Sequence, residues 1–261
     1  MEEYIIMSNS KLVSYTKISP NKTSPRNHVI DTVTIHCVVG QLSVEALGDI
    51  FASSSTQASS NYGVGTDGKI GMYVEEKDRS WCSSSRSNDN RAITIEVASD
   101  TTHPYAVNDK AYNALINLLV DICKRNKIKK LLWKADKNLI GQVDKQNMTV
   151  HRWFADKACP GDYLYYRHGA IANAVNVKLG VLDSAASTVT ESSTAKKVPY
   201  QVRIKIDNLR IRSGAGTEFS SKGFIKPGIY TIVEEAAKQD GHWGKLKSGA
   251  GWISLDYCEK I

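Results

Sequence analysis

Three side chains in the stretch "TVHRWFADKACPG", residues 149–161, are of types that could act together in catalysis. His151 and Cys159 are eight positions apart, and Lys157 comes two residues before the cysteine. A catalytic zinc ion takes three protein ligands and keeps one position open for water, and imidazole and thiolate are among its usual ligands. The stretch therefore offers two of the three ligands of a zinc site, with a cation beside them.

The third ligand should come from a rigid element, and His36 in "TVTIHC" is the best candidate. This β-branched run predicts a strand, and successive side chains of a strand point to opposite faces. His36 and Cys37 therefore point apart, so Cys37 is interpreted as a small buried hydrophobic residue rather than a second ligand. The remaining histidines are interpreted as non-ligands: His28, His103, His168 and His242.

A second strand, "AITIEVA", carries Glu96 on the face opposite to Ile95 and Val97. A carboxylate near a zinc-activated water can accept its proton, and a lysine near the same metal can stabilise the oxyanion that forms. Glu96 and Lys157 fit these two roles. Taken singly, each also has an ordinary interpretation as a solvent-exposed charge.

The elements that must position these groups alternate along the chain. Strand-like runs at 31–39 and 91–99 are followed by segments with helical spacing of apolar residues, at 43–51, 108–126 and 163–179. Asn108 is the predicted N-cap of the longest helix. This alternation predicts an α/β domain with a mixed sheet flanked by helices.

A change in composition divides the chain. Residues 182–197, "LDSAASTVTESSTAKK", are rich in Ser, Thr and Ala and predict a flexible linker between a domain at 1–181 and a second one at 198–261. The second domain contains short strand-like runs with turn residues between them, including "VRIKI", "YTIVEE" and "GWISL". This pattern predicts a small all-β barrel.

The order of the first domain's motifs closely resembles that of a known family. A strand ending in His-Cys, then "SSNYGVGTDGKIG", "RAITIEVA" and finally a histidine with "DKACPG" resemble the zinc-dependent N-acetylmuramoyl-L-alanine amidases of the bacteriophage lysozyme and peptidoglycan-recognition type. The resemblance covers roughly residues 25 to 178 and implies the amidase/peptidoglycan-recognition fold. It also implies that His36, His151 and Cys159 bind Zn²⁺.

The resemblance implies roles for further residues. Tyr62 matches a family tyrosine near the attacking water and the scissile carbonyl, with a place as a core or rim aromatic as the alternative. Lys157 matches the lysine before the metal cysteine. Glu96 stands where the cytoplasmic recycling amidases of this fold carry a catalytic glutamate. Whether Glu96 or Tyr62 handles the proton stays open, although Glu96 is favoured because a carboxylate is ionised at neutral pH. Trp81 resembles the rim aromatic of the family, and Arg152 and Trp153 follow the second histidine. All three are candidates for the lining of the substrate groove, with a place in the core or on the surface as the alternative.

The second domain resembles the bacterial SH3-type domain of cell-wall hydrolases, on the signature "LRIRSGAGT". Ala215 and Gly244 depart from residues that are common there, which leaves its ligand open. The implied role is to hold the tethered enzyme near its substrate. The alternative role is that of a solubilising or dimerising appendage.

Together these features predict an endolysin that cleaves the amide between N-acetylmuramic acid and L-alanine in the peptidoglycan of a Gram-positive wall. No signal peptide or membrane span is visible, which suits accumulation in a host cytoplasm until the membrane is breached, and then action on the wall. The five scattered cysteines of the chain argue against a disulfide framework. The coding potential of the first residues suggests Met7 as the natural start.

Two interpretations from other classes remain. One is a non-catalytic peptidoglycan-binding protein of the same fold, against which Cys159, Lys157 and Glu96 speak. The other is a nucleic-acid binder, which the net charge of +7 permits. The densest basic stretch, "CKRNKIKK", is better explained as a helix end and its following loop. The target bacterium, the ligand of the second domain and the oligomeric state are left open.

Overall fold

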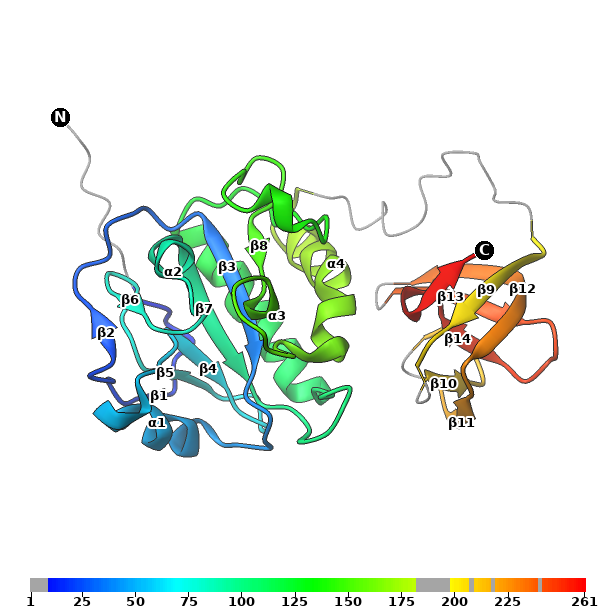
Figure 1. The fold of residues 1–261 in the computed structure, drawn as a ribbon, viewed down its shortest axis with the longest axis horizontal. Coiled ribbons are helices and arrows are strands. Elements are labelled where there is room, and N and C mark those ends of the chain that lie inside the picture. Colours follow the sequence, from blue (N-terminus) through cyan, green and yellow to red (C-terminus); the bar gives the residue numbers. More distant parts are fainter. Residues whose placement is uncertain (1–8, 182–197, 207–208, 217–218, 239–240) are drawn as a thin grey trace. The chain divides into compact units, whose positions relative to one another are not determined.

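The computed structural model describes residues 9–181, 198–206, 209–216, 219–238 and 241–261 (Figure 1). The chain divides into two compact units, Met1–Val181 and Leu182–Ile261. The predicted linker, 182–197, and Met7 lie outside the described residues. Within the described ranges, every helix is too short or too polar to cross a membrane.

The first unit is built on a six-stranded sheet in the order β1-β5-β4-β7-β3-β8. All neighbouring strands run parallel except the antiparallel pair β4 and β5, so the sheet is mixed as predicted. The strands are β1 (Tyr15–Thr16), β3 (Thr32–Cys37), β4 (Tyr62–Val64), β5 (Ile70–Met72), β7 (Ala92–Val97) and β8 (Met148–Thr149). A separate two-stranded sheet pairs β2 (Lys22–Thr23) with β6 (Arg79–Ser80).

Four helices accompany the sheet: α1 (Val44–Ala52), α2 (Arg86–Arg91), α3 (Asp109–Arg125) and α4 (Gly161–Lys178). The predicted helices are confirmed to within a few residues. Ser43 caps α1, and Asn108 caps α3 by accepting a hydrogen bond from the backbone N–H of Ala111 at 2.9 Å. A side chain in this position satisfies one of the N–H groups that a helix start leaves without a partner.

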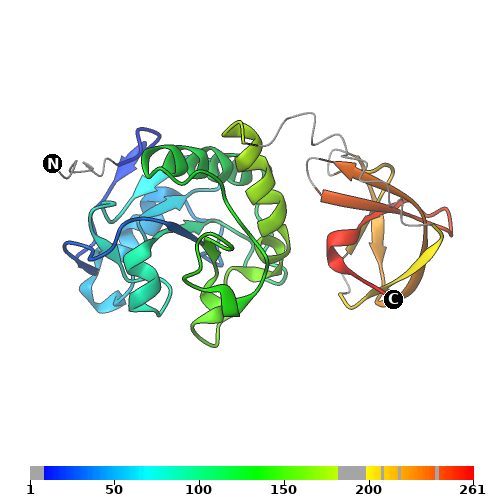
Figure 2. The ribbon, with the colours of Figure 1, turned by 90° about the horizontal axis from the view of Figure 1, so that it is seen from above.

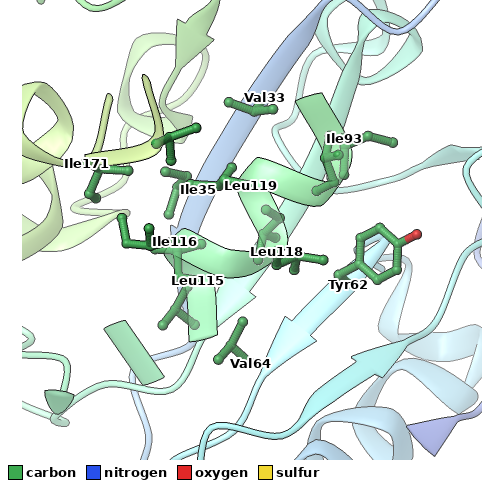
Figure 3. Close-up of a cluster of buried hydrophobic side chains, with 14 of the residues drawn as sticks. Val33, Ile35, Tyr62, Val64, Ile93, Leu115, Ile116, Leu118, Leu119 and Ile171 are labelled. Atoms are coloured by element: carbon green, nitrogen blue, oxygen red, sulfur yellow. The ribbon is translucent and has the colours of Figure 1, made fainter. Parts of the chain in front are cut away.

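Helices α3 and α4 cover one face of the sheet (Figure 2). The apolar residues of α3 at 115, 118, 119 and 122 are all fully buried, as their spacing predicts. They pack on the side chains of β3 and β7 that point to that face, such as Val33, Ile35 and Ile93 (Figure 3). This core leaves the opposite face of the central strands free to carry polar groups.

The second unit is an all-antiparallel sheet of seven strands in the order β11-β10-β14-β13-β12-β9-β15. The strands are β9 (Tyr200–Ile204), β10 (Leu209–Arg212), β11 (Ser221–Ile225), β12 (Gly228–Lys238), β13 (Gly241–Leu246), β14 (Trp252–Ser254) and β15 (Cys258–Lys260). Its all-β character agrees with the sequence pattern. A Cβ at Gly244 would lie 2.5 Å from Leu255 and 3.0 Å from Ile232, so packing accounts for the glycine at this position.

Candidate metal centre

The candidate site lies on the sheet face opposite α3 and α4, where β3 and β7 end. These two strands are parallel and pair in register, so that Thr34 lies beside Thr94 and His36 lies beside Glu96. Because side chains alternate along a strand, both pairs share one face while Ile35 and its neighbours enter the core. The alternation that the sequence predicts for the two strands is confirmed.

Polar side chains stabilise the buried face beneath the site. The Oγ1 atoms of Thr34 and Thr149 are 2.7 Å apart, and the side-chain amide of Asn88 donates to Thr34 Oγ1 at 3.0 Å. Thr94 Oγ1 lies 2.7 Å from Ser80 Oγ and accepts the backbone N–H of Asn61 at 3.1 Å. Since every one of these hydroxyls has a partner, the network holds β3, β7 and β8 in one arrangement.

The structure brings the three predicted metal ligands together. One potential ligand atom from each of His36, His151 and Cys159 lies within 4.8 Å of the others. Cys159 Sγ is 3.2 Å from His36 Nδ1, and the two imidazole rings are 5.1 Å apart between centroids. His151 comes from a 3₁₀ turn at His151–Trp153, and Cys159 lies two residues before the start of α4.

The chemistry of these residues fits a zinc ion. Two imidazoles and a thiolate with an open position are a donor set of catalytic zinc sites. His36 is fully buried and its Nε2 has no hydrogen-bond partner, which is costly for a ring that serves packing alone. The residues present therefore suit a borderline-soft divalent metal.

Burial holds both histidines in the neutral form that binds metals. The pKa of His36 is lowered to about 3 by burial first, and then by the nearby imidazoles of His151 and His168. The pKa of His151 is also lowered, by burial and then by the positive charge of Lys157. The pKa of Cys159 is raised well above its ordinary value by a hydrogen bond with Cys37, by burial and by the charge of Glu96. Metal binding must therefore release the thiol proton.

Glu96 is the carboxylate closest to the ligand cluster along the sheet. Its Oε1 lies 3.9 Å from His36 Nδ1, and its buried Oε2 has no hydrogen-bond partner. Burial raises the pKa of Glu96 to about 7. A carboxyl group with such a pKa can accept and return a proton near neutral pH.

Lys157 and Trp81 lie at the periphery of this cluster. Lys157 is exposed and near enough for its charge to lower the pKa of His151. Trp81 is half-buried, and its indole N–H donates to Thr23 Oγ1 at 3.0 Å. It immediately precedes Cys82, whose Sγ lies 3.9 Å from Glu96 Oε1. Lys157 and Trp81 therefore both have access to solvent beside the site.

The expectation that Tyr62 lies near the attacking water is wrong. Tyr62 pairs with Ile95 across β4 and β7, so it takes the opposite face from Glu96. Its ring lies in the core beside Leu118 (Figure 3). Its hydroxyl donates to Glu76 Oε1 at 2.7 Å and accepts the backbone N–H of Ser10 at 2.9 Å. Burial raises the pKa of this phenol. A resemblance in sequence order did not resolve which face of β4 the tyrosine occupies.

Trp153 is buried in the core and so does not line a groove, whereas the side chain of Arg152 contacts α4 and stays 24% exposed. The guanidinium of Arg152 donates to Asp162 Oδ1 at 3.1 Å and stacks over the Tyr165 ring at 4.5 Å. Trp153 is 8% exposed and stacks on Trp133 with 5.1 Å between ring centroids. Neighbours in a 3₁₀ turn point in different directions, so His151 reaches the metal ligands while the next two residues pack against α4 and the preceding loop.

Two residues near the cluster were not identified from the sequence. Ser84 Oγ lies 2.9 Å from His151 Nε2, and Cys82 belongs to a second group of potential ligands with His36 and Glu96. The polar run "SWCSSS" has no periodicity that could have indicated either contact. Among the described residues, neither His103 nor His168 belongs to a ligand group: His103 contacts Asp162, and His168 donates to the Leu164 carbonyl.

The family model described as N-acetylmuramoyl-L-alanine amidase matches residues 26–162. Among curated proteins, none matches the chain. A mutant endolysin from Bacillus subtilis is 16% identical at a TM-score of 0.46, covering 62% of this chain and 97% of that one. A selenomethionine AmpD derivative is 19% identical at a TM-score of 0.47, and the match covers 65% of this chain and 99% of that one. The N-acetylmuramoyl-L-alanine amidase LysC from Clostridium intestinale is 16% identical at a TM-score of 0.41, and the match covers 64% of this chain and 95% of that one.

Proposed function

The chain belongs to the N-acetylmuramoyl-L-alanine amidase family, and on this premise we propose that it is a zinc-dependent peptidoglycan amidase of the endolysin type. The bond cleaved is the amide between the lactyl group of N-acetylmuramic acid and L-alanine of the stem peptide. The observation that carries the proposal is the cluster of His36, His151 and Cys159 beside the buried Glu96, all within the matched residues.

In this proposal, His36, His151 and Cys159 hold the metal. Bound there, zinc would polarise the scissile carbonyl and lower the pKa of a water towards roughly 7. Glu96 accepts the proton of the attacking water, because its raised pKa of about 7 leaves it ready to exchange protons near neutrality. Lys157 supplies positive charge for the oxyanion, and its exposure lets it reach a substrate on the surface.

The same carboxyl group completes the reaction. Once the carbon–nitrogen bond breaks, Glu96 returns the proton to the leaving nitrogen, so that one water is consumed and no covalent enzyme intermediate is needed. The products are the free lactyl carboxylate of the sugar and a new amino terminus on L-alanine. Trp81 is the proposed substrate contact beside the site, because its ring is half-buried and still reaches solvent.

The test is product analysis on purified Gram-positive peptidoglycan. We expect new L-alanine amino termini, no new reducing sugar ends, loss of cleavage with chelator, and recovery with added zinc. His36→Ala should abolish cleavage, whereas the matched control His28→Ala, at an exposed histidine outside the site, should not. Reducing ends in place of amino termini, or cleavage that persists in His36→Ala, would refute the proposal.

The alternative function is a non-catalytic peptidoglycan-binding protein of the same fold. The presence of Glu96 next to a complete ligand set supports the enzyme, since wall binding alone needs neither. A folded, zinc-replete protein that pellets with the wall but releases no amino termini would establish the alternative.

We also propose that the second unit is an SH3-type wall-binding domain and that the protein lyses the host from within. Its compact all-β sheet and the repeated short strands support this assignment. The enzyme would accumulate in the host cytoplasm and reach the wall once the membrane is breached. When the protein is expressed inside Gram-positive cells, lysis only after the membrane is permeabilised is the expected result, and lysis of expressing cells with an intact membrane would contradict it.

A further inference from the structure

We propose that Cys82 and Glu96 form, together with His36, a second set of metal ligands that competes with the first set for the same ion. The ion would be a thiophilic divalent cation such as Zn²⁺ or Cd²⁺. The inference rests on the proposed function in that it concerns the same metal centre, but it requires no substrate and no turnover.

The three side chains already converge. Cys82 Sγ lies 3.9 Å from Glu96 Oε1, and this oxygen lies 3.9 Å from His36 Nδ1. Ligand atoms of all three residues lie within 4.8 Å of one another. With zinc–ligand bonds of about 2.0 to 2.3 Å in a tetrahedron, neighbouring ligand atoms are separated by roughly 3.3 to 3.6 Å. Small side-chain adjustments therefore suffice to enclose an ion.

Cys82 is held in place by its own backbone. Its N–H donates to Asp89 Oδ2 at 3.0 Å, and the N–H of Ser83 donates to the same carboxylate. Asp89 is 2% exposed and lies in α2, so a buried charge anchors the turn that presents the thiol. On the other side, the buried Oε2 of Glu96 has no hydrogen-bond partner and is free to complete a carboxylate–metal contact.

The two sets exclude each other because they share His36. Its Nδ1 is 3.2 Å from Cys159 Sγ and 3.9 Å from Glu96 Oε1, and one nitrogen lone pair binds one ion. An ion held by Cys82 and Glu96 also occupies the carboxylate that must accept the proton. The second set therefore stores metal in a form that cannot hydrolyse the amide.

Thiolate and carboxylate donors define the class of ion. A site with one thiolate, one imidazole and one carboxylate favours Zn²⁺ or Cd²⁺ and does not suit Mg²⁺, which prefers an all-oxygen octahedron. Cadmium bound to thiolate absorbs in the ultraviolet, so each thiolate ligand can be counted without an activity assay.

The test is cadmium titration of the full chain in cysteine variants. Cys159→Ser removes the thiolate of the first set, and we expect it to retain a cadmium–thiolate band. The double variant Cys159→Ser/Cys82→Ser should lose the band. Cys159→Ser/Cys123→Ser is the matched control and should keep it, because Cys123 is buried in α3 on the other face of the sheet. Absence of the band in Cys159→Ser, or its persistence without Cys82, would overturn the proposal.

A second measurement covers the case in which the double variants do not fold. In His151→Ala, which keeps every cysteine, bound Cd²⁺ should slow alkylation of Cys82 by about tenfold when the free ion is at about ten times its dissociation constant. Cys258, a half-buried cysteine of the other unit, is the internal reference for mass spectrometry. An unchanged rate at Cys82 would refute the second ligand set. Both readouts stand even if the chain proves to cleave no peptidoglycan.

Discussion

His36 and Glu96 face each other from adjacent parallel strands, with Nδ1 of the histidine 3.9 Å from Oε1 of the glutamate. The histidine is fully buried and the glutamate side chain is 15% exposed. The register of two strands thus places a metal ligand and a proton acceptor side by side in a site that is largely shielded from water. This pair is the basis of the first predictions.

Replacing Glu96 with Gln should abolish the proton transfer and leave the metal ligands intact. We expect kcat to fall by about 10²- to 10⁴-fold, the usual contribution of a general base. Zinc should still bind through His36, His151 and Cys159, which calorimetry on the variant would check. A variant that loses zinc as well would contradict the assignment of Glu96 as the base rather than a primary ligand.

The same substitution should stabilise the metal-free protein at alkaline pH. The ordinary pKa of a glutamate is 4.5, and burial raises that of Glu96 to about 7. Between these values the unfolded chain loses its proton while the folded chain keeps it, so the free energy of unfolding falls as pH rises and stays lower above 7. Glu96→Gln removes the free-energy cost of ionising a buried carboxyl group, which is at most about 3 kcal/mol. Urea unfolding at pH 5 and pH 8, with Asp100→Asn as an exposed control, should show a gain at pH 8 only.

Tyr62→Phe should affect stability and not catalysis. The Tyr62 hydroxyl bonds with Glu76 and with the backbone of Ser10, so its loss leaves buried polar groups without a partner and costs about 1–3 kcal/mol. The kcat of the folded variant should stay near that of the wild type. If kcat fell as far as in Glu96→Gln while stability was unchanged, the phenol would have to reach the substrate and its placement in the core would be wrong.

Asp162→Asn should weaken metal binding, because Asp162 orients the loop that carries two of the ligands. Its carboxylate accepts both terminal guanidinium nitrogens of Arg152 at 3.1 Å, and the Arg152 backbone N–H donates to the Cys159 carbonyl at 3.1 Å. Loss of such outer partners typically weakens metal affinity by about 10- to 100-fold. Competition with a chromophoric chelator would measure the change. Asp156→Asn, at an exposed position of the same loop, is the control, and equal affinity of the two variants would contradict this role.

His168 should make the protein sensitive to acid. It is fully buried, and burial lowers its pKa to about 4 from an ordinary value of 6.5. Below pH 6.5 the unfolded chain gains a proton that the folded chain does not take up until about pH 4. As the pH falls from 6.5 to about 4, the free energy of unfolding should therefore decrease, by up to about 1.4 kcal/mol per pH unit. His168→Gln should reduce this slope, and a slope equal to that of the wild type would refute the contribution.

Much of the first unit follows from local patterns. The spacing of apolar residues at 111, 115, 118, 119 and 122 predicts α3, and Asn108 predicts its start. Alternation in β3 and β7 predicts that the side chains of His36 and Glu96 point to the face opposite the core. The grouping of His151 and Cys159 with His36, which the residue types and the family resemblance predict, is found in the structure.

The residues that the sequence misplaced or missed share one cause: their directions depend on contacts with other segments of the chain. The motif around Tyr62 predicts a place at the site, but the pairing of Tyr62 with Ile95 puts its ring in the core. The position of Trp153 after a ligand favours a groove residue, but the 3₁₀ turn directs its ring into the core. Cys82 has no pattern around it, and only the turn anchored by Asp89 brings its thiol to Glu96.

By itself, the sequence determined which residues could bind metal and which face of its own strand each side chain takes, because residue chemistry and strand alternation are local properties. The tertiary structure alone decided which side chains of different segments meet. That choice depends on the register of β3 against β7 and β4 and on the path of the loops before α2 and α4. Register and loop path are set by long-range packing, in which many distant contacts act together, and no short stretch of sequence contains that information.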